Sequence, residues 1–189
     1  PGVRGAVGPG DVDALTDEPG HEGQAVAAVA ADTIEQARAA VELIDVEWDV
    51  RKPQLDAEEA ANKGELVGGV SRYERGDVDR ALAQADVVVE AEYRTQTVLH
   101  SSFETHQSVC EWRGDSLDVY ISTQFIWGVR DEVSGKLGLP PDKVRVVCEF
   151  MGGGFGSKNG AGDYTFIAIE LAKRTGRPVR CALTRREEN

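Results

Sequence analysis

Apolar residues recur in two different patterns between residues 24 and 50. Residues 24–31 are small and apolar, as in a buried strand. Four apolar residues then recur at spacings of three and four, on one face of a predicted helix: Ile34, Ala37, Val41 and Ile44. Asp32 is positioned to cap this helix, with Glu35 in a capping-box arrangement. The following segment VEWDV alternates apolar and polar residues, so the pattern predicts a strand–helix–strand unit.

The middle of the chain has the alternation expected of strands. The segment GDVDRALAQAD, residues 76–86, suggests one or two helical turns capped by Asp77. After it, residues 87–101, 108–112 and 116–123 are rich in β-forming residues. The segment Arg113–Asp115 reads as a tight turn between the last two of these strands. A β-hairpin is therefore expected here.

After Gln124 the period changes from two to that of a helix. Four apolar residues fall on one helical face, Ile126, Val129, Val133 and Leu137, and Gly138 with two prolines ends the helix. A strand, KVRVVCEF, then enters a glycine-rich loop. Asp163 is expected to cap a second helix, which ends at Gly176 before the strand PVRCAL.

Composition limits the possible partners. The chain has 189 residues, a net charge of −12 and a pI near 4.7, with no concentrated basic patch, which argues against nucleic acid. No apolar run approaches the length of a membrane span and no leader is recognisable, so a soluble, cytoplasmic protein is expected. The absence of an initiating methionine and the ending directly after a strand suggest a piece of a longer chain or one subunit of a split one.

The cysteines and histidines do not predict a metal site. Cys110, Cys148 and Cys181 are far apart and lie in apolar, strand-like segments, where a small buried side chain is the favoured interpretation. His100 and His106 are six residues apart, a spacing that suits neither a helix face nor paired strands. No protein-side metal ligand is therefore predicted.

The loop MGGGFGSKNGAGDY, residues 151–164, is the main candidate for chemistry. A strand, a glycine-rich turn and a helix present backbone N–H groups to an anion. The loop satisfies neither the phosphate-loop pattern nor the dinucleotide pattern. A plain flexible turn would not need three adjacent glycines. The third interpretation is a loop whose backbone packs against a large cofactor, while Phe155 keeps water out.

Four segments in order carry a family resemblance. The segments are EGQAVAAVAADTIEQARAAVELIDVEWD, SFETHQSVCEW, STQ followed by MGGGFGSK, and GRPVRCALTRREEN. They resemble the molybdopterin-binding large subunit of the xanthine dehydrogenase and aldehyde oxidase family. The resemblance implies an α+β fold: the end of an α/β hammerhead domain at 1–52, a linker at 53–75, and the first part of a molybdopterin-binding domain at 76–189.

The resemblance assigns the cofactor-binding residues. Gln124 matches a glutamine whose side-chain amide donates to a molybdenum oxo group, and Gly153, Gly154, Phe155 and Gly156 match the loop that approaches the cofactor. Read without the family, Gln124 would be a polar residue capping the following helix and Phe155 a core residue.

Three further residues follow from the same resemblance. Glu104 is expected to be a buried partner for backbone donors, and Lys158 either neutralises a local carboxylate or faces solvent. Asn159, proximal to the substrate, stands where xanthine-oxidising members have a glutamate that contacts the purine. A neutral amide cannot act as that acid, which favours an aldehyde, an N-heterocycle or a small aromatic over xanthine, with carbon monoxide left open.

The resemblance also implies that several components of the enzyme lie outside this chain. The catalytic glutamate is expected outside this chain, and the iron–sulfur clusters and FAD on partner chains or segments. The expected enzyme is a multi-subunit molybdenum hydroxylase acting on a small molecule, and this chain alone is expected to be inactive. The alternative is a noncatalytic binding or assembly module that keeps the fold without the metal.

Overall fold

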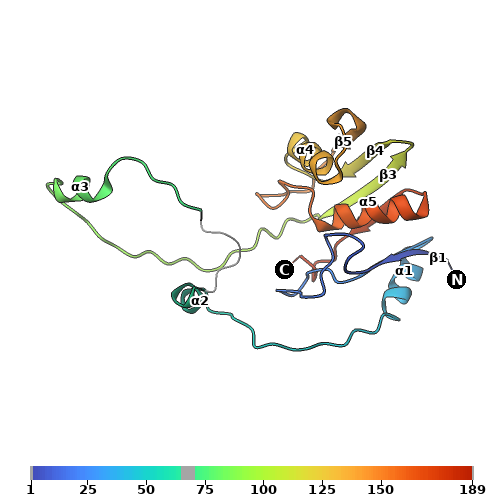
Figure 1. Ribbon diagram of the computed structural model, residues 1–189, viewed down its shortest axis with the longest axis horizontal. Helices are drawn as coiled ribbons and strands as arrows, with labels where there is room; N and C mark the ends of the chain where they lie inside the picture. The colour runs from blue at the N-terminus through green and yellow to red at the C-terminus, as the bar shows by residue number, and fades with distance from the viewer. Residues whose placement is uncertain (1, 65–70, 189) are drawn as a thin grey trace. The chain divides into compact units, whose positions relative to one another are not determined.

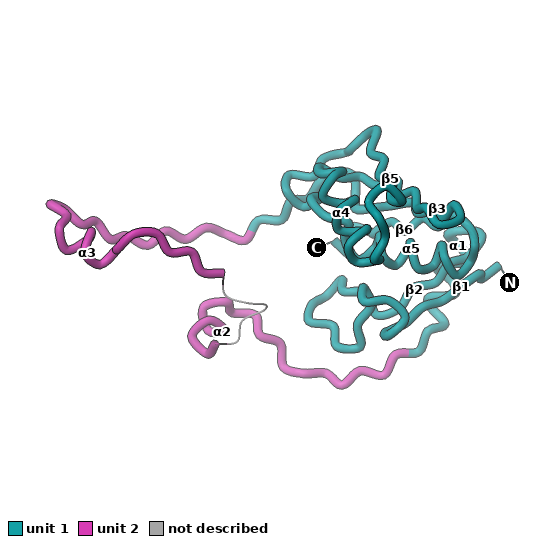
Figure 2. Tube along the Cα trace, turned by 45° about the horizontal axis from the view of Figure 1, so that its top comes forward, with its two compact units in different colours: residues 1–45, 98–189 teal, residues 46–97 magenta. Residues whose placement is uncertain are grey.

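The computed structural model describes residues 2–64 and 71–188 of the chain, which form two compact units. Residues 1–45 and 98–189 make the first unit and residues 46–97 the second (Figure 2). The first unit mixes helices with two small sheets (Figure 1). The predicted α+β class is therefore confirmed, while the hammerhead and linker assignments stay predictions.

A four-stranded sheet is the centre of the first unit. The strands β3 (Gln107–Arg113) and β4 (Ser116–Ile121) form the predicted hairpin, whose turn contains Gly114 at φ +65°. The strand β5 (Val144–Val147) pairs parallel to β4, and β6 (Val179–Ala182) pairs antiparallel to β3. The strand order is β5-β4-β3-β6.

Two helices flank the glycine loop in sequence. The helix α4 (Ile126–Leu137) ends at Gly138, the short 3₁₀ helix η1 spans Pro141–Lys143, and α5 (Asp163–Thr175) ends at Gly176. Both glycines adopt the left-handed conformation, which confirms the predicted helix ends. The predicted cap of α5 is wrong: Asp163 is the first helical residue and Gly162 occupies the cap position, because the glycine alone can take φ +69° there.

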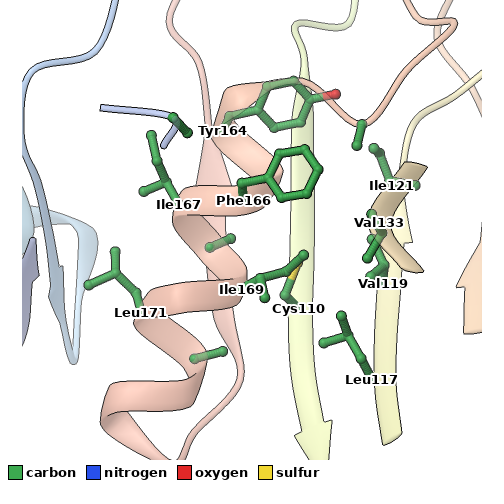
Figure 3. Packing of buried hydrophobic residues seen from close by; sticks show 14 of the residues in the cluster. Cys110, Leu117, Val119, Ile121, Val133, Tyr164, Phe166, Ile167, Ile169 and Leu171 are labelled. Atoms are coloured by element: carbon green, nitrogen blue, oxygen red, sulfur yellow. The ribbon is translucent and has the colours of Figure 1, made fainter. Parts of the chain in front are cut away.

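The core lies between this sheet and the two helices. Figure 3 shows side chains of α5 directed at Cys110 of β3, beside Leu117 and Val119 of β4. All three strand residues are fully buried. The indole of Trp112 donates to the Ile169 carbonyl over 3.1 Å, which also joins β3 to α5.

The three cysteines are free thiols. Burial raises the pKa of Cys110 to about 12 and that of Cys181 to about 11. These two thiols therefore stay protonated near neutral pH, which agrees with the interpretation as small apolar side chains.

The N-terminal segment packs on the outer side of α5 (Figure 1). It contains β1 (Val3–Val7), the antiparallel β2 (Ala28–Ala31) and α1 (Ile34–Val41). The strand and helix are as predicted, although the expected apolar face of α1 stays partly exposed.

The predicted cap of α1 is wrong by one residue. Thr33 caps the helix by accepting from the Gln36 N–H. Asp32 instead pairs with Arg4 and Arg177, at 2.6 and 2.8 Å, so its carboxylate is not available for capping.

The second unit contains α2 (Ala57–Lys63) and α3 (Val78–Ala83), and Asp77 caps α3 as predicted. The predicted strands at 46–50 and 87–101 are wrong, because these segments have no strand partner among the described residues. The part of the expected linker at 65–70 lies outside the described residues. None of the helices in residues 2–64 and 71–188 is long and apolar enough to cross a membrane.

Candidate functional site

The glycine loop meets the segment that ends with Gln124 at one end of the strands of the sheet. The strands β4 and β5 are parallel, so the residues that follow each of them emerge at the same end. Residues 122–124 follow β4, and the loop at 151–158 comes soon after β5. The backbone N–H of Gln124 donates to the Lys158 carbonyl over 2.8 Å, which fastens the two segments together.

The side chain of Gln124 is oriented by the loop. Its Oε1 accepts the N–H of Gly156 at 2.8 Å and, more weakly, that of Lys158 at 3.4 Å. Because N–H donors occupy the oxygen, the amide NH₂ must point away from them. Within the described residues this NH₂ donates to no other group.

Gln124 does not cap α4. The Phe125 N–H at the start of that helix donates to Thr123 Oγ1 over 3.1 Å. The helix-cap interpretation of Gln124 is therefore wrong in this structure.

Two of the loop glycines are required by the protein's own side chains. A Cβ at Gly154 would lie 2.4 Å from Gln124 Oε1, and one at Gly152 would lie 2.4 Å from Glu104 Cβ. Gly153 and Gly156 have φ values of +92° and +104°, which side chains rarely tolerate. The glycines thus serve the internal packing of the loop as well as any approach by a ligand.

Phe155 is held in an unusual position. Its φ is +54°, in the left-handed region that costs a non-glycine residue about 1 kcal/mol or more. The residue is 73% exposed, so Phe155 is not a core residue of this chain. A strained, exposed aromatic within a glycine loop is typical of a ligand-facing position.

Three consecutive loop amides are available as donors. The neighbouring N–H groups of Gly152 and Gly156 are used by Glu104 and Gln124. Within the described residues, the N–H groups of Gly153, Gly154 and Phe155 donate to nothing. Successive free N–H groups in a turn form a concave site for anions and other acceptors.

An ion pair with one fully buried partner supports the loop. Lys158 is fully buried, and its Nζ contacts Glu104 Oε2 at 3.1 Å, Ser122 Oγ at 3.0 Å and the Glu104 carbonyl at 2.9 Å. Of the two open alternatives for Lys158, the structure therefore selects neutralisation of a carboxylate. Glu104 also accepts the Gly152 N–H at 2.7 Å, as expected for a partner of backbone donors.

The charge on Glu104 is stabilised by these donors. Burial by itself would raise its pKa, but hydrogen bonds from Ser122, Gly152, Gln107 and Lys158 outweigh burial and lower the pKa to about 2. Glu104 is therefore ionised near neutral pH and holds the ammonium of Lys158 in place.

A second anchor lies on the other side of the loop and was missed from the sequence. His106 contacts Glu188 Oε1 through Nδ1 at 2.6 Å and the Ser157 carbonyl through Nε2 at 3.1 Å. A cavity of about 330 Å³ adjoins it, lined by His106, Ser157, Tyr164 and Glu188 among others. No spacing rule would have paired His106 with a residue 82 positions away.

Asn159 lies on the loop surface. Its Nδ2 donates to the Gly156 carbonyl over 2.9 Å, and its side chain is exposed. The amide therefore helps to fold the loop on itself, and its place near a substrate stays a prediction.

A model of the molybdopterin cofactor-binding domain matches residues 59–189. The chain belongs to this family. The match covers the hairpin, the Gln124 segment, the glycine loop and the anchoring residues on both sides of it. The resemblance drawn from the four ordered segments is thereby confirmed.

Two curated relatives and one solved structure agree with this assignment. The chain is 30% identical over 169 residues to a xanthine dehydrogenase/oxidase of Gallus gallus, covering 88% of this chain and 12% of that protein. It is 32% identical over 166 residues to PaoC, an aldehyde oxidoreductase molybdenum-binding subunit of Escherichia coli K12, covering 87% and 23%. A CO dehydrogenase from Oligotropha carboxidovorans superposes with a TM-score of 0.81 at 26% identity, covering 100% and 28%.

The chain thus spans less than a third of the length of each of these proteins. It corresponds to a molybdopterin-binding domain of the molybdenum hydroxylases.

The residues present suit a molybdopterin cofactor. The free N–H groups at 153–155 can meet phosphate or pterin acceptors, and the outward NH₂ of Gln124 is a donor held in a fixed direction. The exposed ring of Phe155 provides an apolar surface next to Gly153.

Proposed function

We propose that this chain is the part of a molybdenum hydroxylase that binds the molybdopterin cofactor, in an enzyme that oxidatively hydroxylates an aldehyde or an N-heterocyclic or aromatic compound. The observation that carries the proposal is the fixed carboxamide of Gln124. Loop amides hold its oxygen, so its NH₂ is available as a preorganised donor.

Each part of the site has a separate task. The amides of residues 153–155 bind acceptor groups of the cofactor, and Phe155 excludes water from the face where the substrate reacts. Gln124 donates from Nε2 to an oxygen that gains negative charge during the reaction. When bound, the cofactor supplies the oxygen transfer and accepts the two electrons.

The substrate class is inferred from Asn159. Its amide is neutral and already bonded to the loop, so it offers no acid to a purine. This favours an aldehyde or a heterocycle whose binding needs no carboxyl group at this position. The named activities of the relatives differ from one another, so the family alone does not select among them.

Other chains or segments complete the proposed enzyme. The catalytic glutamate, the iron–sulfur clusters and FAD are proposed to lie outside these residues, on partners that form a multi-subunit complex. Alone, the chain is proposed to be inactive. Turnover by the purified 189-residue chain would contradict this part of the proposal.

The test is elemental analysis of the complex purified from its source, with mass spectrometry of every chain in it. We expect stoichiometric molybdenum together with iron. A metal-free native complex would contradict the proposal and support the noncatalytic binding or assembly module.

A single substitution separates cofactor donation from loop packing. Gln124→Glu keeps an oxygen for the Gly156 N–H but removes the NH₂ donor. We therefore expect the turnover of aldehydes by the assembled complex to fall about 100-fold while the fold is kept. Gln84→Glu, at the exposed end of α3, is the matched control. Equal activity of both variants would refute the role of Gln124.

A further inference from the structure

His106 stands between two hydrogen-bond acceptors. One is the Glu188 carboxylate, 2.6 Å from Nδ1, and the other is the Ser157 carbonyl, 3.1 Å from Nε2. The side chain of His106 is 19% exposed and that of Glu188 is 6% exposed. Bulk water therefore has little access to either contact.

Glu188 acts only as an acceptor. Its Oε1 also receives the backbone N–H of His106, and its Oε2 receives Arg185 Nη1 at 2.7 Å. A carboxyl group that accepts from these donors on both oxygens is ionised. The proton between Glu188 and His106 therefore resides on Nδ1.

The Ser157 carbonyl cannot donate at all. A hydrogen bond between it and Nε2 thus requires a second proton, on Nε2. Both contacts are hydrogen bonds only when both ring nitrogens carry protons, as in an imidazolium paired with the Glu188 carboxylate. The rings of His106 and Tyr164 also pack in an edge-type contact, with their centroids 5.7 Å apart.

The peptide group after Ser157 connects this pair to Gln124. Its carbonyl accepts from His106 Nε2, and its N–H, that of Lys158, points at Gln124 Oε1 from 3.4 Å. Ser157 itself donates from N and Oγ to the Gly154 carbonyl at 3.0 and 2.8 Å. His106 and Gln124 therefore hold opposite ends of one peptide group within the glycine loop.

We propose that His106, kept doubly protonated by Glu188, is a positioning residue that sets the glycine loop and the carboxamide of Gln124 through the peptide between Ser157 and Lys158. Only one part of this proposal rests on the proposed function, namely that the oriented NH₂ of Gln124 donates to a cofactor. A positively charged donor on the carbonyl polarises the peptide and strengthens its N–H as a donor. The oxygen of Gln124 is then held more firmly, and its NH₂ keeps its direction.

The chain supplies a matched pair of variants. Glu188→Gln removes the charge that keeps both protons on His106. Glu187→Gln changes the preceding glutamate, whose carboxylate accepts the Thr184 N–H and does not contact His106. His106→Gln keeps one donor of similar reach but cannot serve both acceptors.

The first readout is nuclear magnetic resonance of the full chain near neutral pH. We expect both ring nitrogens of His106 to carry protons in the native chain and in Glu187→Gln, and one to be lost in Glu188→Gln. A native His106 with one unprotonated nitrogen would overturn the proposal.

The second readout follows the loop by hydrogen exchange. Loss of a charge-assisted bond should make the amides of Gly156 and Lys158 exchange about tenfold faster in Glu188→Gln and His106→Gln. The side-chain NH₂ signals of Gln124 should shift in the same two variants and stay unchanged in Glu187→Gln. Unchanged Gln124 signals in all three would refute the link, since a purely structural role of His106 would leave them in place.

These readouts do not depend on molybdenum. A metal-free native complex with the expected spectra would refute the proposed function and leave the positioning role intact. A molybdenum-containing complex with a neutral His106 would support the proposed function and refute the positioning role.

Discussion

Lys158 shows how a single buried charge organises the site. Its ammonium is fully buried, yet it is surrounded by the Glu104 carboxylate, a carbonyl and the Ser122 hydroxyl. Removing Glu104 would leave this ammonium buried and unpaired, which is costly, whereas Glu104 itself is partly exposed. The pair therefore fixes where the loop begins and where it ends.

We expect Lys158→Met to lower the free energy of unfolding by about 1–3 kcal/mol, because the partly exposed Glu104 loses its counter-charge and the Ser122 hydroxyl loses a partner. The double variant Glu104→Gln/Lys158→Met should lose less than the sum of the single variants. Lys143→Met, which breaks an exposed pair with Asp115, should cost under about 1 kcal/mol. Urea unfolding measures all four, and strictly additive losses would show that the two side chains do not interact.

The charge on Glu104 should also appear in the pH dependence of stability. Its pKa is about 2 in the folded chain against an ordinary 4.5, so it contributes stability above pH 4.5 that is lost as pH falls towards 2. The stability difference between the native chain and Glu104→Gln should therefore be largest near pH 6 and shrink below pH 4.5.

Glu59→Gln is the control for this titration, because Glu59 pairs with Lys63 on the exposed helix α2. Its stability should stay within about 1 kcal/mol of the native chain. A Glu104→Gln difference that stays constant from about pH 6 to 3 would contradict the lowered pKa.

At the scale of elements, the glycine loop shows a constraint that composition only partly reveals. Its glycine content predicts that other atoms approach the loop backbone closely. The sequence does not show whether these atoms belong to a ligand or to the protein's own side chains. In the structure, the side chains of Gln124 and Glu104 fill the space beside Gly154 and Gly152. These contacts join residues 30 and 48 positions apart, which local pattern reasoning does not reach.

Gly154→Ala should therefore push Gln124 away from the loop. The added Cβ would lie 2.4 Å from Oε1, and we expect a loss of about 1–3 kcal/mol in unfolding free energy together with lower molybdenum content of the complex. Gly135→Ala in α4 has no atom within 4 Å of the new Cβ and should be neutral or stabilising. Equal stability and equal metal content in the two variants would disprove the contact.

The helices and the hairpin could be predicted because their signals are local. Apolar spacing located α4 and α5, glycines marked both of their ends, and a tight turn located the hairpin between β3 and β4. The exact caps were less predictable. Asp32 satisfies the cap pattern, but two arginines distant in sequence compete for its carboxylate.

At the scale of the whole molecule, the missed strands have a common cause. Residues 87–101 alternate well and are rich in valine, yet a strand forms only where a partner strand supplies hydrogen bonds. The structure offers no such partner within its described residues. Alternation of apolar and polar residues shows that a segment could fit into a sheet. Whether it pairs depends on which other strands the folded chain brings beside it.

The two units should consequently differ in local stability. In the described residues 46–64 and 71–97, every residue except Ala60 is exposed, whereas β3, β4 and α5 surround a fully buried core. Opening of the second unit breaks few apolar contacts. Amides in its described residues should therefore exchange close to the rate of an unfolded chain. Amides of β3 and β4 should exchange only through global unfolding. Hydrogen exchange with mass spectrometry on the full chain measures this contrast. If residues 87–97 were as protected as β3, that alternating segment would be paired as a strand after all.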